Sequence, residues 1–314
     1  MSESNIAIEL KNVDKHFGAV HANSKVSLTV QSGTIHGIVG ENGAGKSTLM
    51  SILYGFYQAD SGQIKVFDKD FRATSSKQSI EAGIGMVHQH FMLVDNFTVL
   101  ENVILGSEGS ALITQSLEKA RIELTRLAKE YGLEVELDIA VEDLSVGMQQ
   151  RVEILKGLYK GAKVLILDEP TGVLTPQESD ELFRIFEALK KQGVTIILIT
   201  HKLREIMSIT DHVSVMRAGK MVAHLQTSET NPEELAELMI GRKVLLNINK
   251  TKAKSGKALL VANNLEIHNE QGLKRVTNVS FEACSGEILG IAGVTGNGQG
   301  TLLKALAGIL PLSK

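Results

Sequence analysis

The chain has 314 residues, a net charge of −3, and ordinary apolar and charged fractions of 43% and 22%. These values indicate one large globular domain or two, since domains commonly contain about 100–200 residues. The charge gives no reason to expect a nucleic-acid partner, which usually requires a basic face. The single cysteine, Cys284, excludes an intrachain disulfide and a cysteine-based zinc cluster, and it favours a reducing, cytoplasmic compartment.

Short apolar runs predict the strands of an α/β protein. They lie at residues 6–10, 26–30, 34–39, 163–167, 194–199 and 212–217. Runs such as VTIILI are far shorter than the ~20 residues that a membrane-spanning helix needs, so we interpret them as buried parallel strands. Any link to a membrane must therefore come through a partner.

Capping residues and apolar periodicity predict the helices between these strands. Thr98 and Glu101 have the spacing of a capping box for a helix that begins TVLENVIL. An apolar stripe over 117–131 predicts a second helix, which Gly132 ends. Further signals are Thr175, Pro176 and Glu178 at one helix start, and Asn231, Pro232 and Gly241 around another.

Strands that alternate with helices predict a mainly parallel central sheet. The stretch from about 95 to 160 shows no convincing strand, which suggests a helical subdomain inserted into the α/β core. An internal repeat then indicates how many such domains the chain contains.

The repeat pairs VSLTVQSGTIHGIVGENGAGKSTL, which begins at Val26, with VSFEACSGEILGIAGVTGNGQGTL, which begins at Val279. At this constant offset of 253 residues, the coinciding glycines are Gly33, Gly37, Gly40, Gly43 and Gly45 with Gly286, Gly290, Gly293, Gly296 and Gly298. Matching glycines indicate matching backbone conformations, because glycine tolerates positive φ and the close approach of a ligand. The same strand–loop–helix unit therefore begins twice.

The segment GENGAGKST, residues 40–48, follows an apolar strand and opens a helix, which is the context of a phosphate-binding loop. Its glycines let successive backbone N–H groups turn toward phosphate oxygens, and the helix start adds partial positive charge. Lys46 is placed to reach the β- and γ-phosphates, and the Ser47 hydroxyl to ligate Mg²⁺. The predicted nucleotide contacts are Gly40, Glu41, Asn42, Gly43, Ala44, Gly45, Lys46, Ser47 and Thr48.

The segment VLILDE, residues 164–169, is an apolar strand that ends in two carboxylates. Ligands of α/β folds bind at the carboxyl ends of the strands, so this pair is predicted to lie near the phosphate-binding loop. We expect Asp168 to hold Mg²⁺, directly or through water, and Glu169 to polarise the attacking water.

The segment LSVGMQQR, residues 144–151, places a serine, a glycine and two glutamines at a helix start. Together with the loop, Gln89 in MVHQ, VLILDEP and His201 in ILITH, it stands in the order and approximate spacing of the ABC ATPase family. The resemblance covers residues 5–242. It implies a P-loop NTPase fold of the ABC type, with a mainly parallel central sheet and an inserted helical subdomain.

The resemblance also implies further site residues. Phe17 would stack on adenine, a contact that contributes roughly 1–3 kcal/mol in nucleic-acid binding. Gln89 would contact Mg²⁺ and water and connect the site to membrane subunits, and His201 would contact the γ-phosphate. The residues expected to contact ATP held by a second nucleotide-binding domain are Ser145, Gly147 and Gln149.

Departures from the family pattern resemble a subgroup of importer ATPases with two fused nucleotide-binding domains that serve simple sugars and nucleosides. They are Val146 and Met148 in the signature segment, and Thr175 where an aspartate is usual. In the second copy, Gln299 and Gly300 replace the lysine and the serine of the phosphate-binding loop. We expect that altered site to hydrolyse ATP poorly, if at all.

The repeat and the resemblance together predict the domain organisation. Residues 1–242 would form a complete nucleotide-binding domain, 243–257 a polar, lysine-rich linker, and 258–314 the N-terminal part of a second, degenerate domain. Because the second copy stops soon after its loop and helix, we expect it to be a fragment. The competent loop would then need a partner domain from a missing half or from a second copy of the chain.

The predicted function is ATP hydrolysis that powers an ABC importer at the cytoplasmic face of the cell membrane. Its partners would be transmembrane permease subunits and an extracytoplasmic substrate-binding protein. Residues 88–108 resemble the nucleoside-type members, with monosaccharide import as the alternative. A soluble ABC ATPase acting on DNA or ribosomes is disfavoured by the single cysteine, the lack of sustained heptads and the short linker. A regulatory module without hydrolysis is disfavoured because Glu169 and His201 are both present.

Overall fold

The computed structural model describes residues 5–88, 91–106, 113–243, 254–268, 272–293 and 296–311. The chain divides into two compact units, Met1–Val244 and Leu245–Lys314. Gln89, one of the predicted site residues, lies outside the described residues, as does most of the predicted linker.

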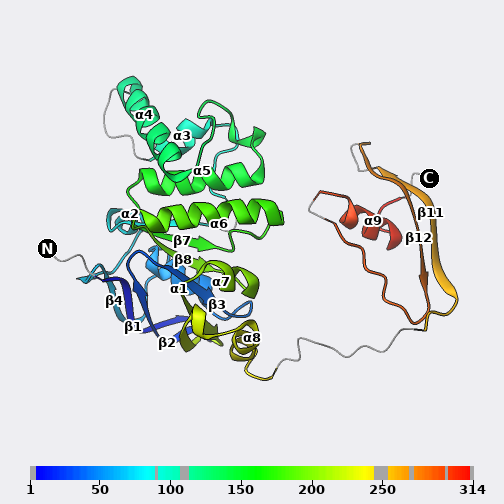
Figure 1. Ribbon diagram of the computed structural model, residues 1–314, viewed down its shortest axis with the longest axis horizontal. Coiled ribbons are helices and arrows are strands. Elements are labelled where there is room, and N and C mark those ends of the chain that lie inside the picture. Colours follow the sequence, from blue (N-terminus) through cyan, green and yellow to red (C-terminus); the bar gives the residue numbers. More distant parts are fainter. Residues whose placement is uncertain are drawn as a thin grey trace. The chain divides into compact units, whose positions relative to one another are not determined.

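A six-stranded sheet with the strand order β10-β9-β3-β8-β7-β6 forms the centre of the first unit (Figure 1). Its strands are β3 Ile35–Val39, β6 Ile84–Val87, β7 Val164–Asp168, β8 Thr195–Ile199, β9 His212–Arg217 and β10 Lys220–Gln226. Neighbouring strands are parallel except β10, which runs antiparallel to β9. The prediction of a mainly parallel central sheet is therefore confirmed.

Alternate residues of the central strands enter two different cores, because successive side chains of a strand point to opposite faces. Ile35 and Leu198 pack with helices α3–α8 on one face. Ile38 and Ile197 pack on the other face with α1 and with the strands of a second sheet. All five residues of β3 are buried, which fixes the strand that precedes the phosphate-binding loop.

The second sheet is antiparallel, with the order β2-β1-β4-β5. Its strands are β1 Ile6–Phe17, β2 Val20–Gln31, β4 Ser61–Val66 and β5 Lys69–Asp70. β1 and β2 form a long hairpin that extends well beyond the predicted runs at 6–10 and 26–30. The extensions are polar and carry register shifts, so their sequence lacks a clear alternation.

Helices fill the remainder of the first unit. They are α1 Lys46–Leu53, α2 Ser76–Glu81, α3 Val99–Ile104, α4 Ile113–Tyr131, α5 Val146–Tyr159, α6 Pro176–Lys191, α7 Leu203–Ile209 and α8 Pro232–Ile240, with 3₁₀ turns at Val141–Asp143 and Thr227–Glu229. Helices α3, α4 and α5 pack together as a helical layer, seen above α6 in Figure 1. Within the described part of 95–160, strand pairing is limited to one bridge, Thr98 with Ala140, so the helical subdomain is confirmed.

The predicted caps occur where the sequence places them. Thr98 and Glu101 make both hydrogen bonds of a capping box, and Thr175 and Glu178 make the same pair of bonds at α6. Such a cap contributes about 1 kcal/mol to helix stability. Gly241 ends α8 in the left-handed conformation, which glycine adopts without strain.

The second unit contains a hairpin of β11 Ala258–His268 and β12 Lys274–Cys284, followed by helix α9 Gln299–Leu306. A small apolar core joins them; its buried members are Ala262, Leu265, Ile267, Val276, Leu302 and Ala305. The segment between β12 and α9 forms no strand in its described part, and the Ile288 side chain there is 89% exposed.

Candidate functional site

The predicted phosphate-binding loop lies at the carboxyl end of β3 and leads directly into α1. Gly43 and Gly45 have φ values of 81° and 99°, which ordinary side chains rarely adopt. A Cβ atom at Gly45 would stand 2.4 Å from the Ala22 carbonyl oxygen, so this position admits only glycine. The loop is also held by Asn23, whose Nδ2 donates to the Gly45 carbonyl at 3.1 Å.

Lys46 folds back over this loop from the first turn of α1. Its Nζ donates to the carbonyl oxygens of Gly40 and Glu41, at 2.7 and 3.0 Å, and the residue is buried. Burial lowers the pKa of the Lys46 ammonium, and the charges of Glu169 and Asp168 oppose that shift. The single buried cation of the loop therefore faces the two carboxylates at the end of β7.

Asp168 ends β7 close to the side chain of Ser47, which lies in the first turn of α1. Burial raises the pKa of the Asp168 carboxyl, the nearby Ser47 hydroxyl lowers it, and the Glu169 charge raises it further. The structure thus brings together Lys46, Ser47, Asp168 and Glu169, as the positions of their strands and loop predict.

Glu169 and His201 form a pair at the ends of two neighbouring strands, β7 and β8. His201 Nδ1 lies 2.9 Å from Glu169 Oε1. An ionised carboxylate only accepts hydrogen bonds, so in that state Nδ1 carries the proton and donates it. Glu169 has a φ of 48°, an uncommon value for a residue with a side chain, and its N–H donates to the Ile199 carbonyl at 2.9 Å. The glutamate is therefore held by its backbone as well as by its side chain.

Phe17 ends β1 at the tip of the hairpin, with 41% of its surface exposed. Lys15 Nζ lies 5.3 Å from the centre of its ring, and Tyr57 meets it edge-on with ring centres 5.0 Å apart. Lys15 also pairs with Asp60 at 2.9 Å. The Phe17 ring is therefore held in place by Tyr57 and Lys15, and part of it remains accessible to a ligand.

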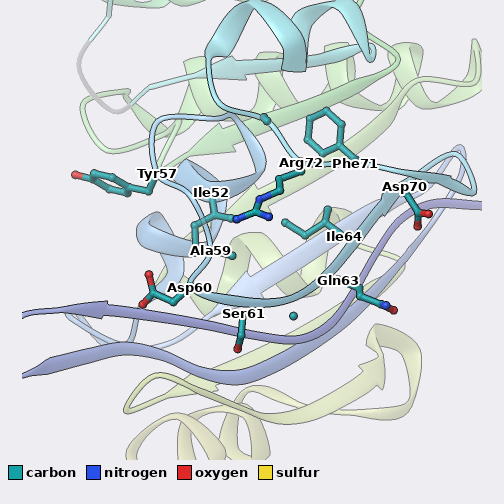
Figure 2. A pocket seen from close by; sticks show the side chains of 12 residues that line it. Ile52, Tyr57, Ala59, Asp60, Ser61, Gln63, Ile64, Asp70, Phe71 and Arg72 are labelled. Atoms are coloured by element: carbon teal, nitrogen blue, oxygen red, sulfur yellow. The ribbon is translucent and has the colours of Figure 1, made fainter.

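Tyr57 and Asp60 also line a cavity of about 340 Å³ between the segment after α1 and strands β4 and β5 (Figure 2). None of the predicted nucleotide contacts lines this cavity. It is a neighbour of the predicted site and not the site itself.

Ser145, Gly147 and Gln149 lie at the start of α5 in the helical layer, not at the phosphate-binding loop. Ser145 is the N-cap of α5 and accepts from the Met148 N–H at 3.4 Å. The Gln149 amide donates to the carbonyls of Val141 and Leu144, at 3.1 and 3.3 Å. The structure therefore separates these three residues from the residues around Lys46 (Figure 1).

Sequence reasoning missed two contributors to this arrangement. Asn23 is fully buried in β2 and braces Gly45, but a single asparagine in a polar strand segment carries no distinguishing signal. Tyr57 supports Phe17 from the segment after α1, forty positions away in the chain. Only the folded structure brings such pairs together.

The comparisons with known proteins agree with this geometry. Residues 23–172 match the family model described as ABC transporter. The chain carries an ABC transporter ATP-binding domain. The ABC-type P-loop fold that the sequence predicts is thereby confirmed.

Solved structures of ATP-binding cassettes resemble this chain. A nucleotide-free ATP-binding cassette from an ABC transporter has a TM-score of 0.66 and 26% identity, covering 76% of this chain and 100% of that chain. A cassette of an ABC transporter in its ADP conformation has a TM-score of 0.65 and 27% identity, covering 76% and 99%.

Several curated relatives of this ABC protein are import ATP-binding proteins. It is 47% identical over 302 residues to the nucleoside import ATP-binding protein NupA of Lactococcus lactis subsp. cremoris, covering 96% of this chain and 60% of that protein. It is 47% identical to the guanosine import ATP-binding protein NupO of Bacillus subtilis, covering 96% and 59%. The ribose import ATP-binding protein RbsA of Clostridium tetani is 40% identical, covering 96% and 59%. The chain thus spans about 60% of the length of these relatives.

In the part of the chain that the structure describes, every helix is too short or too polar to cross a lipid bilayer.

Proposed function

We propose that this protein binds ATP with Mg²⁺ at residues 40–48 and hydrolyses it to drive an importer. One observation carries the proposal: the Glu169–His201 pair lies at the carboxyl end of the sheet, beside the loop over which Lys46 is folded. A positioned base next to a phosphate-binding loop and its lysine is the constellation that phosphoryl transfer to water requires.

Each side chain of the site would have a distinct task. The backbone N–H groups of the loop and the Lys46 ammonium bind phosphate oxygens and offset their charge. Glu169 accepts a hydrogen bond from the attacking water and orients it. His201 would donate to the Glu169 carboxylate through Nδ1, and when the ring carries both protons its Nε2 would donate to a γ-phosphate oxygen. Phe17 offers its exposed ring to adenine.

Ser47 and Asp168 fit a magnesium ion. Mg²⁺ prefers oxygen ligands and is commonly held by one or two carboxylates together with substrate phosphates and water. The Ser47 hydroxyl and the Asp168 carboxyl provide such oxygens side by side, next to the lysine of the loop. When bound, the ion would neutralise charge on the phosphates. Gln89 is proposed as a further contact on the resemblance alone.

A second nucleotide-binding domain would complete the site. Ser145, Gly147 and Gln149 lie on the helical layer, apart from the loop that holds the nucleotide, so they are suited to contact ATP bound by another domain. Loss of the γ-phosphate would then remove the contact that holds the two domains together. The partner is either another part of the same protein or a second copy of this chain.

We also propose that the second unit corresponds to the first part of another, degenerate ABC domain. Its hairpin, loop and helix follow the order of β1, β2, the phosphate-binding loop and α1, although residues 285–293 form no strand in the place of β3. Gly296 and Gly298 have φ values of 94° and 92°, close to those of Gly43 and Gly45. Gln299 stands where the first copy has its lysine, and a neutral amide offers phosphate no compensating charge. This supports the domain division at residues 1–242, 243–257 and 258–314.

The proposed cargo is a nucleoside, delivered by an extracytoplasmic binding protein to transmembrane permease subunits, with this chain at the cytoplasmic face of the membrane. The 47% identity to NupA and NupO, against 40% to RbsA, supports this choice. Monosaccharide import is the second candidate, because a glucose import ATP-binding protein of Haloferax volcanii is 42% identical.

Phosphate release from ATP tests the proposal. We expect turnover in the wild-type chain and its loss in both Lys46→Ala and Glu169→Gln. The glutamine variant is expected to retain ATP binding, since the lysine and the loop are intact. Normal turnover in Glu169→Gln would show that another group orients the water.

A further inference from the structure

A buried glutamate outside the predicted site joins the two segments that carry Glu169 and His201. Glu205 lies in the first turn of α7 and is 7% exposed. Its Oε1 accepts a hydrogen bond from the Thr171 hydroxyl, and its Oε2 accepts one from the Thr200 hydroxyl at 3.1 Å. A carboxylate this deep in a protein is costly unless both oxygens are satisfied, so the two hydroxyls account for its placement.

Lys202 completes the network around this carboxylate. Its Nζ lies 3.2 Å from Glu205 Oε1 and donates to the carbonyl and hydroxyl oxygens of Thr171, at 2.9 and 3.0 Å. Its backbone N–H donates to the Thr200 hydroxyl at 3.0 Å. Each threonine hydroxyl therefore accepts from Lys202 and gives its own proton to Glu205. Among the residues that the structure describes, neither hydroxyl proton has another acceptor.

The two threonines stand next to the reacting pair in the chain. Thr171 follows Glu169 by two residues, in a turn closed by the Gly172 N–H and the Glu169 carbonyl at 3.1 Å. Thr200 directly precedes His201. Glu205 thus connects the loop after β7 with the loop after β8, and the Glu169–His201 contact of 2.9 Å lies between these two loops.

We propose that Glu205 is a positioning residue that holds Glu169 and His201 at their working distance. The inference rests on the proposed ATP hydrolysis and adds a residue to it. Glu205 touches neither the phosphate-binding loop nor Lys46 through any hydrogen bond given by the described residues, so it acts through the two loops. Misplacement of a reacting group by about 1 Å can cost on the order of 100-fold in rate, whereas nucleotide affinity depends mainly on the loop and its lysine.

Substitutions can separate this role from a general contribution to folding. Glu205→Gln keeps the size of the side chain but leaves one threonine proton without an acceptor. Thr171→Val removes one hydroxyl, and Thr171→Ser retains it. Thr227→Val is the matched control, because Thr227 is also buried and, among the described residues, its hydroxyl bonds to Thr210 alone, at 2.8 Å, at the far end of α7.

The experiment measures kcat by phosphate release, and the Kd for a non-hydrolysable ATP analogue by calorimetry. We expect kcat to fall about 10- to 100-fold in Glu205→Gln and in Thr171→Val, with Kd within about twofold of the wild-type value. Thr171→Ser should restore most of the turnover, and Thr227→Val should leave it unchanged.

The outcomes distinguish this inference from the proposed function. Wild-type turnover that persists in Glu205→Gln and Thr171→Val would overturn the positioning role alone. So would equal losses in Thr171→Ser and Thr171→Val, or a similar loss in Thr227→Val. If Glu205→Gln fails to fold, the two Thr171 variants decide the question. Absence of turnover in the wild-type chain would overturn the proposed function itself.

Discussion

Acid should destabilise the first unit through a buried histidine in β3. His36 is 3% exposed, and its Nε2 lies 2.7 Å from the Ser214 hydroxyl, which also meets His224. Its Nδ1 has no hydrogen-bond partner among the described residues. Burial, together with the nearby His212 and His224, lowers the pKa of His36 from 6.5 to about 3.

The sign and size of the effect follow from this shift. Since the folded-state pKa lies below the unfolded value, the unfolded chain binds the proton more readily. The contribution of neutral His36 to the free energy of unfolding is complete above pH 6.5 and is lost as the pH falls toward 3. At pH 5.5 the loss is about 1.4 kcal/mol, and it grows by about 1.4 kcal/mol for each further pH unit.

Urea unfolding of the wild type and of His36→Gln at pH 7.5 and pH 5.5 would measure the pH-dependent contribution of His36 to the free energy of unfolding. Glutamine keeps a polar group near Ser214 but does not titrate, and His212 and His224 remain in both proteins. We expect the wild type to lose about 1.4 kcal/mol more than the variant between the two pH values. An equal loss in both proteins would refute the assignment to His36.

Two further predictions concern the nucleotide site. Gly43→Ala should cost about 1–2 kcal/mol of folding stability, because its φ is positive but its Cβ would meet no atom within 4 Å. Gly45→Ala should cost about 1–3 kcal/mol more folding stability than Gly43→Ala, because its Cβ would overlap the Ala22 carbonyl oxygen. Equal melting temperatures for the two variants would contradict this difference. Phe17→Ala should weaken ATP binding by about 1–3 kcal/mol in calorimetry. It should lower the melting temperature only slightly, because the ring's contacts with Tyr57 and Lys15 are partly exposed, and an unchanged affinity would remove Phe17 from the site.

The sequence predicts those parts of the fold that depend on local chemistry. Thr98 with Glu101, and Thr175 with Glu178, satisfy helix N-termini with their own side chains, so four residues suffice to place a helix start. The strands β3, β7 and β8 are buried on both faces. Their apolar residues, interrupted in β3 by His36 and Gly37, are recognisable in the sequence without any partner.

The strands that were missed lack such a local signal. β6 has only four residues, two of them Gly85 and Met86, and it is recognisable only through its pairing with β7. β4 and β10 alternate poorly because they are partly exposed, and their strand conformation comes from neighbours distant in sequence.

In the candidate site, too, some features follow from the local sequence and others arise only from tertiary packing. The loop with Lys46, and the carboxylates after β7, are predictable because strand ends and glycine-rich turns restrict the backbone. The role of Glu205 cannot be predicted from the sequence, because a glutamate in the first turn of a helix is ordinarily explained by the helix dipole. Only the packing of α7 against the loops after β7 and β8 places that carboxylate between Thr171 and Thr200.

Calorimetric titration of the purified chain with ATP, in the presence and absence of Mg²⁺, is the sharpest test of nucleotide binding at residues 40–48. We expect saturable binding that Mg²⁺ strengthens, and that Lys46→Ala abolishes without unfolding the protein. Absence of magnesium-dependent affinity for ATP in the wild-type chain would contradict it.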